Sequence, residues 1–128
     1  MSQEEPSKLN VGIKMWIKGP ADSRSLFGPG DVRLLLSLKT TNNLTKSAQE
    51  LEYSYKYAWQ KLKDLTKKTG LSVVETHRGG YGGGGAMQVT PWGEYLIAIY
   101  SEINNRVSDF KLTIDDYIKK NPFKLENN

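Results

Sequence analysis

The chain has 128 residues and a formal net charge of +4, from 18 Lys or Arg residues against 14 Asp or Glu residues. This length suits one domain with a modest core, and the lack of cysteine excludes disulfides and thiolate metal sites. No apolar run approaches the length of a membrane span, and no apolar signal segment begins the chain, so we expect a cytoplasmic protein without a membrane partner.

The first residues are polar, and we expect residues 1–7 to form a disordered tail. Between Leu9 and Ile17, apolar residues alternate with mostly polar ones. A period of two predicts a β-strand with one apolar face, which can pair with a hairpin later in the chain to make a three-stranded sheet. A loop at 19–24 separates this strand from the first predicted helix.

That helix begins at a Gly-Pro-Gly-Asp sequence, where Asp31 or Gly30 can act as the N-terminal cap. The residues from Val32 to Leu38 are mostly apolar, so the helix carries apolar side chains on most sides. We therefore expect it to be the core helix of the domain and to end in the turn cluster 40–43.

A short helix beginning at Thr45 and a longer one beginning after Ser54 come next, joined by a turn at Glu52 and Tyr53. Thr and Ser are residue types that cap helices, and two helices joined by so tight a turn predict a helix-turn-helix. The start of the shorter helix is the positive end of its dipole. Three residues there can therefore meet a phosphate or simply cap the helix: Thr45, Lys46 and Ser47.

The longer helix, residues 54–69, has an apolar face and an opposite basic face when residues are placed at about 100° intervals. The apolar face is expected to pack inward and comprises Tyr55, Ala58, Trp59, Leu62 and Leu65. An α-helix fits the DNA major groove, so Lys56, Tyr57 and Gln60 are candidates for reading bases. The DNA-binding candidates on this helix are Ser54, Tyr55, Lys56, Tyr57, Gln60, Lys61 and Lys63. The alternative is an ordinary solvated helix face.

Two β-prone runs, 73–76 and 87–90, flank a segment rich in glycine. They predict a β-hairpin whose tip has little side-chain bulk and can approach a phosphate chain or a minor groove closely. The candidate contacts at this tip are Arg78, Gly79, Gly80, Tyr81 and Gly82. A plain connector is one alternative. A nucleotide-phosphate loop is disfavoured because no Gly-Lys-Ser/Thr follows.

The last predicted helix begins at Thr90-Pro91 and ends at Asn121-Pro122, with a tail at 122–128. Apolar residues recur along it at spacings of three and four, as in a coiled coil. These candidate dimerisation residues are Leu96, Ile99, Ile103, Val107, Phe110, Ile114 and Tyr117. We expect the first part of this stripe to pack on the domain and the distal part on a second copy; the alternative is a helix folded back on its own core.

The elements together predict an α+β, mainly helical fold: a winged helix-turn-helix with a small antiparallel sheet and a long C-terminal helix. We expect the winged helix to occupy 8–90 and the C-terminal helix 91–121. Six Lys or Arg residues and two acids lie within 54–90, so the charge excess of the chain is concentrated there. This clustering favours a polyanionic partner such as double-stranded DNA.

Four segments carry a resemblance to a known family; they are FGPGDVRLL (27–35), SYKYAW (54–59), VETHRGGYGGGGA (74–86) and TPWG (90–93). They resemble the DNA-binding domain of the molybdate-responsive, ModE-type transcription regulators, a domain related to the LysR-type winged helices. The resemblance spans roughly Lys8 to Tyr100. It implies a dimeric regulator whose helix from Ser54 and glycine-rich wing contact operator DNA.

Members of that family carry C-terminal oxyanion-binding domains, whereas this chain ends at Asn128. An oxyanion ligand such as molybdate is therefore doubtful for this chain. No nucleophile with a neighbouring base is visible and His77 is the single histidine, so we expect no enzyme activity, no metal site and no cofactor. The leading hypothesis is a homodimeric, sequence-specific regulator of transcription. The alternatives are a sequence-tolerant, chromatin-type DNA binder and a winged-helix module that binds protein.

Overall fold

The computed structural model describes residues 8–18, 25–77 and 86–124. The chain divides into two compact units, one of Met15–Ser101 and one of Met1–Lys14 with Glu102–Asn128. Within the described residues there are four helices and two two-stranded antiparallel sheets. In chain order they are β1 (Ile17–Lys18), β2 (Ser25–Phe27), α1 (Pro29–Thr41), α2 (Leu44–Glu50), α3 (Tyr55–Thr69), β3 (Val74–His77), β4 (Ala86–Val89) and α4 (Pro91–Lys120).

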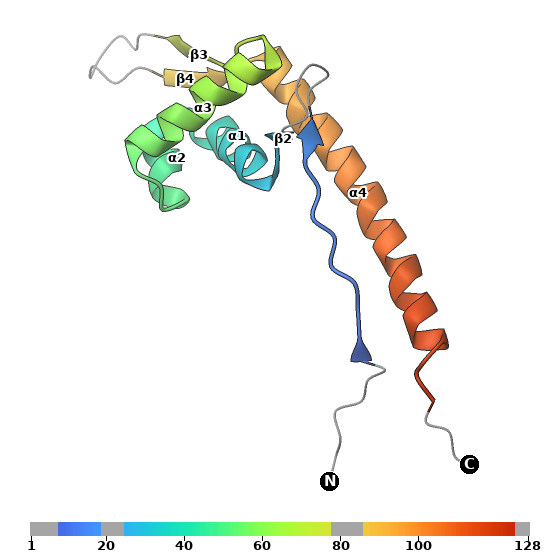
Figure 1. Cartoon of the computed structure of the whole chain (residues 1–128). Coiled ribbons are helices and arrows are strands. Elements are labelled where there is room, and N and C mark those ends of the chain that lie inside the picture. The colour runs from blue at the N-terminus through green and yellow to red at the C-terminus, as the bar shows by residue number, and fades with distance from the viewer. Residues whose placement is uncertain (1–7, 19–24, 78–85, 125–128) are drawn as a thin grey trace. The chain divides into compact units, whose positions relative to one another are not determined.

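This order is that of a winged helix-turn-helix, which confirms the predicted fold class (Figure 1). The helix-turn-helix is α2 and α3, and the wing is the hairpin of β3 and β4. The two wing strands pair in register from Val74 with Val89 to His77 with Ala86. None of the helices in the described ranges combines the length and the apolar character needed to cross a membrane.

The predicted long strand between Leu9 and Ile17 is wrong. Only Ile17–Lys18 is a strand, and it pairs with β2 rather than with the wing, so no three-stranded sheet forms among the described residues. The backbone of this segment is bonded to side chains of α4 instead. The Met15 carbonyl accepts a hydrogen bond from the Tyr100 hydroxyl at 3.0 Å, and the Val11 N–H donates to Asp115 Oδ1 at 2.8 Å.

The caps of α1 and α2 differ from those expected. Gly28 is the N-cap of α1, and Asp31 supports it from the third helical position by accepting the Gly28 N–H at 3.0 Å. Asn43, not Thr45, caps α2, because its side chain accepts the Lys46 N–H at 2.9 Å. The predicted end of α1 is confirmed, with Asn42 in the left-handed conformation at a φ of 53°.

The boundaries of α3 and the start of α4 are as predicted. The Ser54 hydroxyl accepts the Tyr57 N–H at 3.0 Å and caps α3, and Gly70 ends it with a φ of +89°. The turn between α2 and α3 contains Glu52 in the left-handed conformation, with a φ of 60°. α4 begins at Pro91, and the Thr90 hydroxyl accepts the Gly93 N–H at 3.1 Å.

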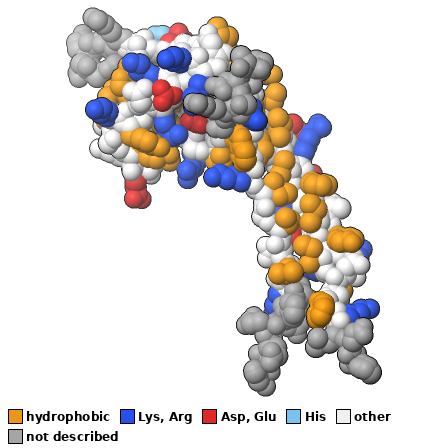
Figure 2. All heavy atoms as spheres, in the orientation of Figure 1, with side chains coloured by type: hydrophobic (Ala, Val, Ile, Leu, Met, Phe, Trp, Pro, Cys, Tyr) orange, Lys and Arg blue, Asp and Glu red, His pale blue; other side chains and the backbone are white. Residues whose placement is uncertain are grey.

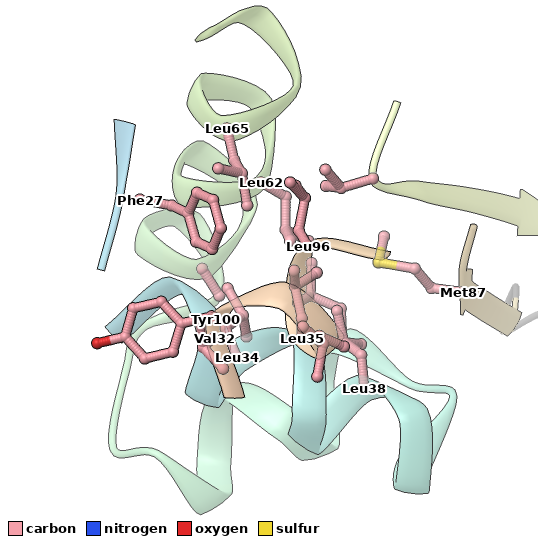
Figure 3. Close-up of a cluster of buried hydrophobic side chains, with 14 of the residues drawn as sticks. Phe27, Val32, Leu34, Leu35, Leu38, Leu62, Leu65, Met87, Leu96 and Tyr100 are labelled. Carbon is pink, nitrogen blue, oxygen red and sulfur yellow. The ribbon is translucent and has the colours of Figure 1, made fainter. Parts of the chain in front are cut away.

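The core of the Met15–Ser101 unit is built around α1, which packs against α2, α3, β2 and β4. Figure 3 shows side chains from α1, α3, β2, β4 and α4 converging on one cluster. Leu34, Leu35 and Leu38 of α1 are almost completely buried, as are Leu62 and Leu65 of α3. Burying each such side chain stabilises the fold by roughly 1.5–3 kcal/mol, so α1 holds the other elements in place.

The apolar stripe of α4 is buried at its start and more exposed further on. Leu96 is buried in the core of Met15–Ser101, and Ile99 packs against it half-buried. In the other unit, Ile103, Val107 and Ile114 are half-buried, whereas Phe110 and Tyr117 are 60% and 67% exposed. Figure 2 shows apolar side chains gathered on the visible face of that unit.

Asp115 anchors the N-terminal segment in the second unit. Its carboxylate accepts hydrogen bonds from Lys111 Nζ and from the Val11 N–H, each at 2.8 Å. The bond from Lys111, followed by that from Val11, lowers the pKa of Asp115, although burial acts in the opposite direction. The lowered pKa means that the ionised Asp115 carboxylate stabilises the fold. This stabilisation is fully present above the ordinary pKa of an aspartate and is lost as the pH falls through the lowered pKa of Asp115.

We predict that Asp115→Ala increases the hydrogen-exchange rate of the Val11 amide at neutral pH, because the acceptor of that N–H is removed. The matched control is Asp116→Ala, which removes the neighbouring exposed carboxylate paired with Lys120 at 2.9 Å. Exchange measured by NMR on both variants checks the contact. Equal Val11 exchange rates in the wild type and Asp115→Ala would contradict it.

A second prediction concerns Gly93, where α4 passes close to the wing strands. A Cβ at this position would lie 2.5 Å from the Val73 carbonyl oxygen and 2.6 Å from Val89 Cγ1. Gly93→Ala should therefore force α4 away from the wing and lower the free energy of unfolding by about 1–3 kcal/mol. Gly12→Ala is the control, since a Cβ there meets nothing within 4 Å. Urea denaturation that gave both variants wild-type stability would refute the close approach.

Candidate DNA-binding surface

The predicted base-reading residues lie together on the exposed side of α3. Lys56, Tyr57 and Gln60 are exposed, and so is Lys63. The Gln60 amide nitrogen donates to Asp64 Oδ1 at 2.9 Å, one turn further along the helix. This bond leaves the amide oxygen and a second N–H available, which is the pair that recognises adenine.

The expectation that Tyr55 and Trp59 pack inward is wrong. Tyr55 is 54% exposed and Trp59 is 42% exposed. The buried strip of α3 is narrower than the apolar sequence pattern and comprises Ala58, Leu62 and Leu65. Tyr55 lies in the first exposed turn of α3, where it remains a candidate for contacting DNA.

The three candidates at the start of α2 are placed differently from one another. Thr45 and Lys46 are exposed. Ser47 is completely buried, and its hydroxyl lies 2.8 Å from the hydroxyls of both Ser37 and Thr41. Ser47 therefore joins α2 to α1 and is not accessible to a phosphate. We leave it out of the surface proposed below.

Lys61 is also engaged within the fold. Its ammonium lies 3.2 Å from Asp31 Oδ1, and both side chains are only about one-fifth exposed. The other oxygen of Asp31 accepts the Gly28 N–H, so one carboxylate joins the start of α1 to the middle of α3. The Lys61 ammonium also lies 5.6 Å from the centre of the Tyr57 ring, close enough for a cation–π attraction.

These surroundings change the pKa of Lys61. Burial lowers the pKa, but the charge of Asp31, the hydrogen bond to it and the neighbouring Tyr57 and Tyr53 together raise it above its ordinary value. Stability from a raised lysine pKa is fully present below the unfolded-state pKa of about 10.4 and is lost as the pH rises through the folded-state pKa. The pair therefore stabilises the fold throughout the neutral range.

The predicted wing contacts Arg78, Gly79, Gly80, Tyr81 and Gly82 lie outside the described residues. The two strands that lead into and out of this segment are described, and their last pair is His77 with Ala86. The side chains of His77 and Glu75 lie 3.9 Å apart on β3, both about half exposed.

No family model matches the chain, but comparison with known proteins finds several that are similar in sequence. The chain is 33% identical over 95 residues to the molybdenum-pterin-binding protein MopB of Rhodobacter capsulatus, a match that covers 74% of this chain and 35% of MopB. It is 30% identical over 96 residues to the DNA-binding transcriptional dual regulator ModE of Escherichia coli (strain K12), covering 73% of this chain and 36% of ModE.

Among solved structures, the BenM DNA-binding domain in complex with benA site 1 DNA is similar, with a TM-score of 0.52 and 17% identity over 74% of this chain and 99% of that one. This likeness supports the fold. The chain spans about a third of the length of its curated relatives, 35% of MopB and 36% of ModE. Together the comparisons confirm the resemblance to the ModE-type regulators over about three quarters of the chain, and the structure of that part is a winged helix-turn-helix.

We predict that Lys61→Met lowers the free energy of unfolding at pH 7 by about 1 kcal/mol, because it leaves the half-buried Asp31 without its partner. The control Lys63→Met removes an exposed charge from the same helix and should change stability by less than about 0.5 kcal/mol. Urea denaturation at pH 7 and above about pH 11 provides the comparison. The difference in free energy of unfolding between Lys61→Met and the wild type should shrink at the higher pH. A difference that did not change with pH would contradict the stabilising role of the Lys61–Asp31 pair.

Proposed function

We propose that the protein regulates transcription by binding double-stranded DNA sequence-specifically as a homodimer. The observation that carries this proposal is the exposed face of α3, where Lys56, Gln60 and Lys63 project from a capped helix buried on its other side. Two of the similar proteins support it by name: the Escherichia coli relative is a DNA-binding transcriptional dual regulator, and the BenM domain was solved with DNA.

In this proposal α3 enters the major groove. Lys56 suits guanine or phosphate, and Gln60 suits adenine through its amide. Tyr57 and Tyr55 are further base-contacting candidates in the first turn, and the Tyr57 ring is held edge-on against Tyr53 at 4.8 Å between centroids. The phosphate contacts come from Lys63 and from three residues near the helix starts: Thr45, Lys46 and Ser54.

The wing is proposed to contact the backbone or minor groove beside the site of α3. Arg78 would supply charge to a narrow groove, the glycines would allow a close approach of the backbone, and Tyr81 would be a further contact. A homodimer would use the distal stripe of α4, where Phe110 and Tyr117 are exposed. Two-fold symmetry would then present two α3 helices to half-sites about one helical turn apart.

We predict that Lys56→Ala and Gln60→Ala broaden the sequence preference, because each removes a base contact worth about 1–3 kcal/mol. Lys63→Ala should weaken binding to all duplexes alike and reduce the slope of log affinity against log salt by about one. Lys61→Ala should leave that slope unchanged, because Lys61 is paired with Asp31.

Fluorescence-anisotropy titrations against salt, with one random-sequence duplex, give the slopes, and binding to a duplex library gives the sequence preferences. If Lys56→Ala, Gln60→Ala and Lys63→Ala all lost affinity uniformly across the library, the assignment of the base-reading residues would be wrong.

A further inference from the structure

We propose that the groove between α3 and β3 holds the sugar–phosphate backbone of one strand of the bound duplex, with the Trp59 ring against deoxyribose. This inference rests on the proposed function and adds a DNA contact to it. The sequence pattern had assigned Trp59 to the core, so the contact becomes visible only from the exposure of its ring.

The groove has a volume of about 560 Å³ and lies within the Met15–Ser101 unit. Its apolar lining comprises Trp59, Leu62 and Val74, of which Trp59 is exposed, Val74 half-buried and Leu62 buried. Thr66 also lines it, with its hydroxyl accepting the Val73 N–H at 3.3 Å. This bond joins α3 to the residue that precedes β3, so the groove is a built feature of the fold.

Two lysines of α3, Lys63 and Lys67, stand on the rim. The Lys63 ammonium lies 5.8 Å from the centre of the Trp59 ring, so a positive charge and an apolar surface are adjacent. Glu75 of β3 also lines the groove, where it lies beside His77. A sugar–phosphate chain alternates apolar rings with anionic groups and matches this combination of aromatic and ammonium side chains.

The position of the groove, beside the exposed face of α3, also favours a DNA strand as its occupant. Lys63 belongs both to the rim and to the exposed face of α3 that is proposed to meet DNA. The opposite wall is β3, the first strand of the wing. A duplex that places its major groove on α3 and its neighbouring surface on the wing must carry one backbone strand between them, and the groove lies there.

The test compares two half-exposed tryptophans. Trp59→Ala should lower the affinity for a random-sequence duplex about tenfold and leave the salt slope unchanged, because the indole carries no charge. Trp16→Ala is the matched control: Trp16 is 48% exposed against 42% for Trp59, lies in the same unit and does not line the groove. Trp59→Phe should retain most of the affinity, and Lys67→Ala should reduce the slope by about one.

A direct readout uses the indole N–H signals of the wild-type protein in NMR, with Trp59→Phe identifying the Trp59 signal. Added duplex should shift the Trp59 signal. It should leave the Trp92 signal unmoved, since the Trp92 indole N–H donates to the Thr69 hydroxyl at 2.9 Å inside the fold. Duplex binding with an unmoved Trp59 signal, together with wild-type affinity of the Trp59→Ala variant, would overturn this inference alone. A wild-type protein that bound no duplex would overturn the proposed function as well.

Discussion

The burial of α1 is the constraint on which the Met15–Ser101 unit depends. A helix with apolar side chains on most sides must be covered on most sides, and α2, α3, β2 and β4 provide that cover. α3 needs only the narrow strip formed by Ala58, Leu62 and Leu65 to do so. Much of its remaining surface stays exposed, including the aromatic rings of Tyr55, Tyr57 and Trp59. A shared core therefore produces the surface that we propose for DNA binding.

Two lysines of α3 show how this packing divides similar residues between roles. Lys61 and Lys63 are two positions apart, so they point about 200° away from each other around the helix. Lys61 faces the start of α1 and pairs with Asp31, whereas Lys63 is exposed beside Trp59. The first lysine fixes the orientation of α3 on the core. The second is available to a polyanion, so counting basic residues alone overestimates the charge that a ligand meets.

Local signals predicted much of this fold. The Ser54 cap, the glycine that ends α3 and the proline that begins α4 act within a few residues, and all three were predicted. The caps of α1 and α2 were wrong by two or three positions, and the other errors concern contacts between separate elements. The Ser47 hydroxyl is buried against hydroxyls of α1. Lys61 pairs with Asp31, 30 positions earlier in the chain, and the Val11 N–H donates to Asp115, 104 positions later. Sequence periodicity contains no information on such partners, so the candidate surface needed the structure to separate exposed residues from engaged ones.

Reading of a DNA sequence by α3 in a symmetric dimer is what we propose for this protein. The most direct measurement is selection of bound sequences from a random duplex pool at about 150 mM salt, where non-specific contacts are screened. We predict enrichment of an inverted repeat whose half-sites are centred about ten base pairs apart. Enrichment without any motif would contradict sequence reading, and recovery of no duplex at all would contradict DNA binding itself.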